Sequence, residues 1–151
     1  MLRDVIAPAL RGLGFQGSAQ SFVLRSDTHW ALVGFQKSRD RYADSVKFTV
    51  NVTVVAREIW KVWREASPHL PARPHANVSY GPGSRQLDPD VRAAYSWERI
   101  GVLMPVRNDY WWEIRADTDT THVAEEVIAA IRDYAIPEIR RHTSSNLRAP
   151  A

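Results

Sequence analysis

Apolar and polar residues alternate most regularly between residues 46 and 56. Valine or phenylalanine stands at every even position from 46 to 54, and polar residues stand between them: Lys47, Thr49, Asn51 and Thr53. A period of two residues is typical of a β-strand, and valine and threonine favour this conformation. We therefore expect a strand over 46–56, with one face on the core and the polar face open to solvent.

Two further pairs of apolar runs predict β-hairpins. Runs 20–25 and 29–37 are separated by a short polar segment that includes Asp27, a residue suited to a turn. Runs 96–105 and 109–117 are separated by a similar short segment. Each pair should form two neighbouring antiparallel strands, so most of the sheet is expected to be antiparallel.

Three segments have the helical period instead, with apolar residues three or four positions apart. They cover residues 2–12, 57–67 and 118–142. Thr120 or Thr121 is expected to cap the third helix, because a hydroxyl oxygen accepts a hydrogen bond from a free N–H group. Pro137 should kink this helix or end its regular part.

This order of elements is typical of an α+β domain. We expect a single, mostly antiparallel sheet of about five or six strands, covered on one face by the N-terminal, middle and C-terminal helices. One domain should extend over residues 1–142, followed by a flexible tail over 143–151. Residues 68–90 are rich in proline and should form an irregular loop, and long loops inside a domain are often functional.

The composition adds few constraints on function. The chain has 151 residues with 20 Lys and Arg against 17 Asp and Glu, and this net charge of +3 is too small to indicate a nucleic-acid partner by itself. The absence of cysteine excludes disulfides, thiolate catalysis and zinc sites of the cysteine type. No stretch approaches the roughly 18 apolar residues of a membrane-spanning helix, so a cytoplasmic protein without membrane contact is expected.

Several short motifs follow one another in a distinctive order. They are Leu13-Gly14-Phe15, Phe35 to Ser38, Phe48 to Asn51, Arg99-Ile100-Gly101 near Leu103, Trp111-Trp112 and, in the last helix, Pro137. With this order and spacing over about residues 2–141, the chain resembles a bacterial family catalogued as domain of unknown function 4304. The resemblance implies an α+β domain, whereas it implies no reaction and no catalytic residues.

Four polar residues are candidates for one ligand-binding patch on the open sheet face: Gln36, Lys37, Asn51 and Arg99. Gln36 and Lys37 stand where a strand runs into a loop, a frequent place for contacts, and Asn51 belongs to the polar face of the next strand. Such a patch would bind an anion or a backbone carbonyl group. In the alternative interpretation, Gln36 and Asn51 bond exposed main chain and Lys37 is solvated.

Trp111 is a further candidate for ligand contact. It precedes Trp112, and the two side chains should point to opposite faces of their strand. If helices cover only one face of the sheet, one of the two is exposed or lies beneath the long loop. An exposed Trp111 near Arg115 has the composition of a protein–protein hot spot, whereas the alternative is that a loop or helix covers it.

Two alternative functions use other residues. A nucleic-acid-binding module would use the basic segment 37–47 with its aromatic residues: Lys37, Arg39, Arg41 and Lys47 with Tyr42 and Phe48. Asp40 and Asp44 reduce the positive potential of this segment. A hydrolase would use residues of the long loop: His69, His75, Asp88 and Asp90. No histidine pair has the spacing of a helical metal site, so no metal or other cofactor is expected.

The first hypothesis is therefore a non-enzymatic binding domain. It would recognise a protein partner through the polar sheet face and the loops 38–45 and 68–95. Recognition of nucleic acid and hydrolysis are the two alternatives, and the sequence gives no indication of the oligomeric state.

Overall fold

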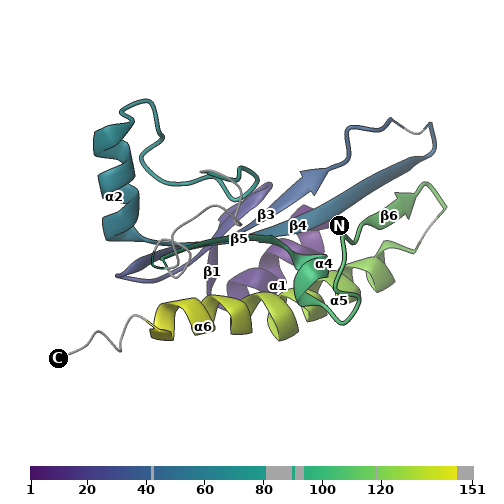
Figure 1. The fold of residues 1–151 in the computed structure, drawn as a ribbon. Coiled ribbons are helices and arrows are strands. Elements are labelled where there is room, and N and C mark those ends of the chain that lie inside the picture. The colour runs from purple at the N-terminus through teal and green to yellow at the C-terminus, as the bar shows by residue number, and fades with distance from the viewer. Residues whose placement is uncertain (42, 81–89, 91–93, 118, 146–151) are drawn as a thin grey trace.

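A long central strand organises the fold. The computed structural model describes residues 1–41, 43–80, 90, 94–117 and 119–145. Within these residues, six strands form one sheet, and β4 (Ser45–Ala56) pairs with β3, β5 and β6. Figure 1 shows β4 running through the middle of the molecule, between helices on its two sides. The position of β4 determines where the candidate site lies.

The strand pairings are all antiparallel in the described sheet. The strands β1 (Phe15–Ser18), β2 (Ser21–Leu24), β3 (His29–Lys37) and β4 are successive neighbours, and β5 (Tyr95–Arg99) and β6 (Trp112–Arg115) both pair with the other edge of β4. The predicted α+β class and antiparallel sheet are confirmed, as is the hairpin that β2 and β3 form. The sequence does not predict β1, because three of its four residues are Gln, Gly and Ser.

The second predicted hairpin is wrong. β5 pairs with residues 51–55 of β4, and β6 pairs with residues 45–48 of the same strand. A short helix, α4 (Ile100–Leu103), separates them, and the chain after it packs so closely on Gly101 that a Cβ atom there would lie 2.7 Å from the Tyr110 backbone nitrogen. Thr49 Oγ1 donates a hydrogen bond to the Tyr110 carbonyl over 2.8 Å. This crossover takes the place of the predicted turn.

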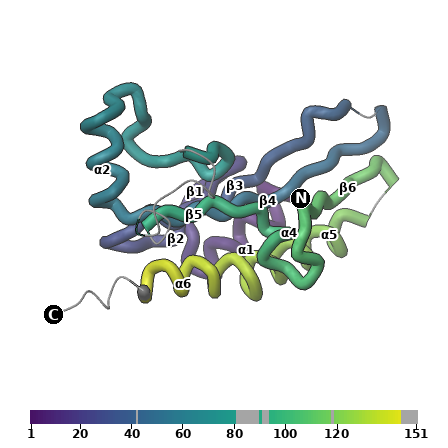
Figure 2. Tube along the Cα trace, viewed as in Figure 1, coloured from purple at the N-terminus to yellow at the C-terminus, as the bar shows by residue number. Residues whose placement is uncertain are grey.

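Helices lie on both sides of the sheet. The N-terminal helices η1 (Leu2–Ile6) and α1 (Ala7–Gly12) share one face with the C-terminal helices α5 (Thr120–Ala130), η2 (Ile131–Ala135) and α6 (Ile136–Ser145) (Figure 1, Figure 2). The middle helix, α2 (Arg57–Ala66), lies on the opposite side, which differs from the expectation that all helices share one face. We call these two sides the terminal-helix face and the α2 face.

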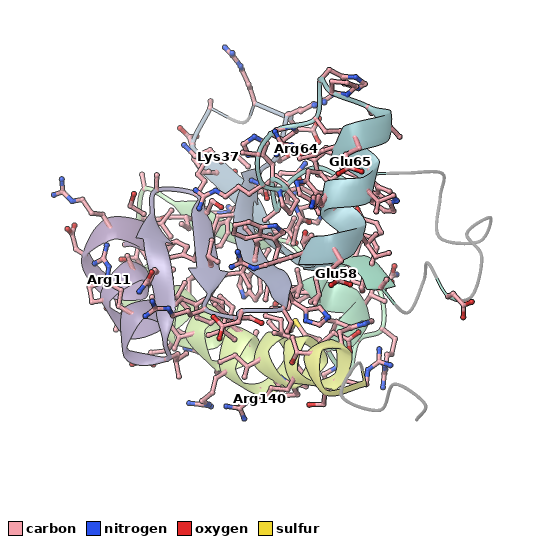
Figure 3. All side chains as sticks on the ribbon, turned by 90° about the vertical axis from the view of Figure 1, so that its left-hand side faces the viewer. Arg11, Lys37, Glu58, Arg64, Glu65 and Arg140 are labelled. Atoms are coloured by element: carbon pink, nitrogen blue, oxygen red, sulfur yellow. The ribbon has the colours of Figure 1, made fainter. Side chains whose placement is uncertain are left out.

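The position of α2 follows from apolar residues that the alternating pattern of β4 does not reveal. Val50, Val52 and Val54 point into the main core beneath the terminal helices, whereas Val55 points to the α2 face and packs in a second cluster with Trp60. Partly buried aromatic residues complete this cluster: Trp30, Trp63, Tyr80 and Trp97. The opposite side of α2 is mostly polar, with Glu58, Arg64 and Glu65 exposed (Figure 3), and it also carries the exposed Val62.

The C-terminal helix changes its geometry near Pro137, as predicted. A π-helical turn, η2, separates α5 from α6, and Pro137 is the second residue of α6. Proline has no N–H group to donate, so the helical hydrogen bonding must change close to it. The predicted cap is wrong, because the carboxylate of Asp119 accepts the hydrogen bond from the Thr121 N–H over 2.9 Å.

Two further expectations concern the ends and the long loop. α6 extends to Ser145, beyond the predicted domain boundary at 142, and the rest of the predicted tail lies outside the described residues. The described part of the proline-rich segment, residues 68–80, contains no regular helix or strand. None of the described helices is both long and apolar enough to cross a membrane.

Candidate functional site

The predicted ligand-binding residues lie on two faces of the sheet. Adjacent residues of a strand point to opposite faces, and the register places Gln36, Asn51 and Arg99 together on the α2 face. Lys37 points to the terminal-helix face, beside Phe48. The predicted patch containing both Gln36 and Lys37 is therefore wrong, because consecutive strand residues cannot share a face.

Asn51 is fully buried, so the expectation that it faces solvent is also wrong. The segment that follows α2 returns across the sheet and places Ala76 and Asn77 against Gly34 of β3. A Cβ atom on Gly34 would lie 2.7 Å from the Cβ atom of Ala76, so glycine permits this close approach. The polar face of β4 is covered by a chain segment that itself supplies amide groups.

Hydrogen bonds hold this covering segment on the sheet. The Ala76 carbonyl accepts one from Trp97 Nε1 over 2.9 Å and one from Thr53 Oγ1 over 3.3 Å. Asn77 Nδ2 donates to the Phe35 carbonyl over 3.1 Å. Because a carbonyl can only accept, this contact fixes which end of the Asn77 amide points away from it.

Asn51 connects the covering segment to Gln36. Its Nδ2 group donates to Asn77 Oδ1 over 3.0 Å and to Gln36 Oε1 over 2.8 Å, so both of its hydrogens are used. Within the described chain, Asn51 Oδ1 has no hydrogen-bond partner. Asn51 therefore orients Gln36, which is half-buried, from below the surface.

Arg99 and Trp111 form the more exposed part of the site. The guanidinium group of Arg99 lies over the Trp111 ring, 4.9 Å from its centroid, and the Arg99 side chain is 26% exposed. Asp109 contacts both residues, because its Oδ2 accepts from Trp111 Nε1 over 2.9 Å and its Oδ1 lies 3.6 Å from Arg99 Nη1. Stacking and the shared carboxylate together hold the two side chains in one arrangement.

The structure brings four of the five predicted residues together. Gln36, Asn51 and Arg99 lie on the neighbouring strands β3, β4 and β5, respectively. The Trp111 ring stacks against the guanidinium group of Arg99. Trp111 is half-buried, whereas Trp112 on the other face is 3% exposed in the main core. The site therefore has a buried amide layer and a surface layer of one guanidinium group and one indole ring.

Two residues of the site are missed by the sequence analysis. Asp109 stands two positions before Trp111, and an acidic residue so close to a candidate tryptophan is a signal that could have been used. Asn77 stands in the irregular segment after α2, where no periodicity shows which side chains face the sheet.

For neither alternative function do the described candidate residues come together in one site. Lys37 and Lys47 point to opposite faces of the sheet, while Arg39 and Arg41 are exposed on the loop between β3 and β4. His69, His75 and Asp90 are exposed, and Tyr42 and Asp88 lie outside the described residues. In the described ranges, no group of three or more His, Asp or Glu side chains is arranged to hold a metal ion.

A second set of ionisable groups involves α6. Glu138 Oε1 lies 2.6 Å from Arg141 Nη2 and 3.0 Å from His142 Nε2, and these contacts together outweigh burial and lower the pKa of Glu138. Burial raises the pKa of Glu98, and the negative charge of Glu138 raises it further. Burial also lowers the pKa of His29, and the charge of His142 adds to this effect. These groups make stability depend on pH.

Comparison with known proteins gives a family match over most of the chain. The model of the family described as Domain of unknown function (DUF4304) matches residues 6–141. The resemblance seen in the sequence motifs is therefore confirmed. No curated protein and no solved structure matches the chain.

Proposed function

The chain belongs to the family described as Domain of unknown function (DUF4304), and because this membership names no activity, we propose from the geometry of its residues that it is a non-enzymatic domain that recognises a protein partner. The proposed contact surface is centred on Trp111 and Arg99. We take the cytoplasm as the place of action, as expected from the composition.

The stacked pair of Arg99 and Trp111 is the observation that supports this proposal. Tryptophan and arginine are enriched among residues that dominate protein–protein binding energy. Asp109 already orients both side chains, so less conformational freedom is lost when a partner binds. A stacked guanidinium group also retains donors for a carbonyl or carboxylate group of the partner.

The segment between Arg99 and Trp111 adds apolar surface. Val102 is 39% exposed and Val106 is 51% exposed, and Arg107 and Asp109 are exposed in the same segment. Exposed apolar side chains with polar neighbours are typical of interaction surfaces. The loop that joins β3 to β4, next to β6 at one end of the sheet, is included in the proposed surface (Figure 1).

Site-specific photocrosslinking tests this proposal. A benzophenone side chain would replace Val106, which is 51% exposed in the segment between Arg99 and Trp111, in one variant and Val62, which is 57% exposed on α2, in the control variant. Trp111 and Arg99 are retained in both, so we expect a protein to be captured from native lysate at position 106 and not at position 62, with or without nuclease treatment. Capture that requires intact nucleic acid, or equal capture at both positions, would contradict the proposal.

The identified partner then allows a quantitative test. Removal of a hot-spot side chain costs about 2 kcal/mol or more, so Trp111→Ala should weaken binding roughly 30-fold or more. Arg99→Gln should have a similar effect, whereas Val62→Ala on α2 should leave the affinity unchanged. Circular dichroism of each variant would show whether the fold is retained.

A further inference from the structure

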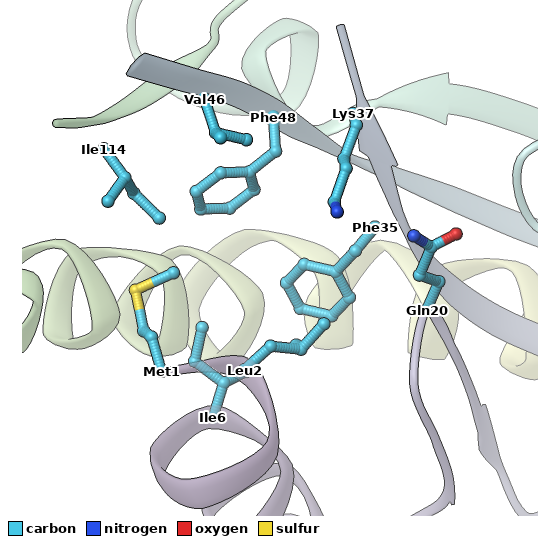
Figure 4. Close-up of a pocket in the computed structure, with 9 residues that line it drawn as sticks. All are labelled: Met1, Leu2, Ile6, Gln20, Phe35, Lys37, Val46, Phe48 and Ile114. Atoms are coloured by element: carbon cyan, nitrogen blue, oxygen red, sulfur yellow. The ribbon is translucent and has the colours of Figure 1, made fainter. Parts of the chain in front are cut away.

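A cavity of about 200 Å³ opens on the terminal-helix face, away from the Arg99 and Trp111 surface. It lies between η1, the ends of β3 and β4, and β6 (Figure 4). Its described lining consists of Met1, Leu2, Ile6, Gln20, Phe35, Lys37, Val46, Phe48 and Ile114. Seven of these nine residues are apolar, so the cavity is suited to an apolar group.

The walls of the cavity are aromatic and aliphatic. The rings of Phe35 and Phe48 lie 6.3 Å apart at an angle of 38°, and Ile114 packs on the same cluster. An apolar cavity of about 150 Å³ in a protein remains dry and binds benzene. The cavity found here is larger and opens to the surface, so it has room for an aromatic ring or an alkyl chain.

Lys37 supplies a positive charge at the cavity. Its side chain extends from β3 toward the ring of Phe35, with the ammonium end near Gln20 (Figure 4). No acidic side chain belongs to the described lining, and no ion pair of Lys37 is found within the described chain. The ammonium group is therefore available to an anion whose apolar part occupies the cavity.

We propose that this cavity binds a small amphipathic carboxylate. The carboxylate pairs with Lys37 and accepts a hydrogen bond from the Gln20 amide, while a tail of medium length packs between Phe35, Phe48 and Ile114. This site is distinct from the contacts of Arg99 and Trp111, because the cavity and those two side chains lie on opposite faces of the sheet. Lys37 thus keeps the predicted role of contacting an anion, but on the face opposite to Gln36, Asn51 and Arg99.

Three probes with the same tail test the role of charge. Octanoate, octanol and octylammonium would be titrated into the full chain below their micellar concentrations, with binding followed by heteronuclear NMR shifts of Ile114 and Val46. We expect octanoate to bind at least tenfold more tightly than octanol, and octylammonium to be the weakest. Absence of octanoate binding, or equal affinity for octanol, would overturn the proposal.

Substitutions in β3 and β4 distinguish binding of octanoate in the cavity from its non-specific attraction to a basic protein. Lys37→Met keeps an apolar side chain but removes the charge, and we expect at least a tenfold loss of octanoate affinity. Lys47→Met is the matched control, because Lys47 points to the other face of the neighbouring strand. Val46→Trp, at a position 47% exposed beside the cavity, should block octanoate and octanol alike. Equal effects of the two lysine substitutions, or unchanged binding with Val46→Trp, would overturn the assignment.

Discussion

Asn51 of β4 and Arg99 of β5 are paired directly across the sheet, and each has a buried polar atom without a hydrogen-bond partner in the described chain. These atoms are Oδ1 of Asn51 and Nη1 of Arg99, the latter 3.6 Å from Asp109. A buried polar group left unpaired costs about 1–3 kcal/mol. Native proteins contain few such groups, and each calls for an explanation such as a functional role. Nε of Arg57 and Nε1 of Trp112 are also buried without such a partner, so this property is not confined to the candidate site. Asn51 and Arg99 differ from these two residues in being direct neighbours across the sheet.

Substitution of Asn51 tests its role as the donor to two neighbouring oxygens. Asn51→Asp replaces the donor by a carboxylate that faces Gln36 Oε1 and Asn77 Oδ1, so the pKa of the new carboxyl group should be raised by burial and by these oxygens. A raised pKa in the folded state means that stability is lost as the pH rises through that pKa. Urea unfolding should therefore show a larger loss at pH 7 than at pH 4.

Two other variants serve as references for Asn51→Asp. Asn51→Ala leaves both neighbouring oxygens without their donor and should cost about 1–3 kcal/mol at either pH. Thr53→Val, on the same strand and face, removes one 3.3 Å hydrogen bond to a carbonyl that Trp97 still contacts, and should cost about 1 kcal/mol or less. An Asn51→Asp variant whose loss does not change with pH would contradict the buried-donor role.

Gly101 is predicted to be essential for the crossover between β5 and β6. A Cβ atom there would lie 2.7 Å from both the nitrogen and the Cβ of Tyr110, and the backbone cannot yield as a flexible side chain can. Gly101→Ala should cost about 1–3 kcal/mol in urea unfolding, as expected for overpacking. It should also shift the indole N–H resonance of Trp111, because the displaced segment carries Asp109.

Gly12 provides the matched control for Gly101→Ala. A Cβ atom on Gly12 meets nothing within 4 Å, and the residue is in α1. Gly12→Ala should therefore stabilise the protein by about 0.5–1 kcal/mol, since alanine loses less conformational freedom in a helix. If Gly12→Ala also lowered the free energy of unfolding, the loss of stability in Gly101→Ala could not be assigned to close packing at the crossover.

The sheet and the order of its elements are largely predictable from the sequence, because strand and helix periods are local properties. The clean alternation over 46–54 correctly predicts β4, and the switch of period at Arg57 correctly predicts the start of α2. The side on which α2 packs depends on distant residues, such as Tyr95 and Trp97, that meet Val55 and Trp60 only after folding. Patterns within one segment do not contain this information.

The candidate site was predicted less well for a related reason. Polar residues on alternate positions of a strand are normally exposed, and Asn51 follows this pattern although it is buried. The irregular segment that covers it has no periodicity, so the contact between Asn51 and Asn77 has no signature in either stretch. By contrast, side chains alternate between the two faces of a strand, so the sequence is enough to predict that Gln36 and Lys37 point to opposite faces.

Glu98 should make the protein less stable as the pH rises. Its pKa is raised by burial and by Glu138, so the stabilising contribution of the protonated group is fully present below the ordinary pKa of glutamate and is lost as the pH rises through the raised value. Glu98→Gln removes this loss. In urea unfolding, its stability relative to the wild type should therefore be higher at pH 7 than at pH 4.

Glu113→Gln is a control with the opposite sign. A hydrogen bond with Ser45 and the charge of Arg115 lower the pKa of Glu113, so its contribution is present above the ordinary pKa and is lost as the pH falls. Glu113→Gln should therefore be less stable relative to the wild type at pH 7 than at pH 4. If the stability of the two variants relative to the wild type changed in the same direction with pH, the opposite pKa shifts assigned to Glu98 and Glu113 would be contradicted.

His29 should contribute a loss of stability toward acidic pH. Burial lowers the pKa of His29, and the positive charge of His142 lowers it further, so the neutral imidazole is the form that suits the folded state. The resulting stability is fully present above the ordinary pKa of about 6.5 and is lost as the pH falls through the lowered value. Urea unfolding between pH 8 and pH 5 should therefore show a steeper decline for the wild type than for His29→Phe, which cannot be protonated.

NMR titration separates the two causes of the His29 shift. The imidazole Cε1–H resonance of His29 should titrate below pH 6.5 in the wild type. In His142→Gln, its pKa should rise only partly toward the ordinary value, because burial is the larger cause and remains in place. Thr28 Oγ1 lies 2.8 Å from His29 Nδ1, and His142→Gln leaves both of these residues unchanged, so we do not expect this contact to cause a difference between the two proteins. A full return to the ordinary pKa in His142→Gln would show instead that charge, and not burial, controls His29.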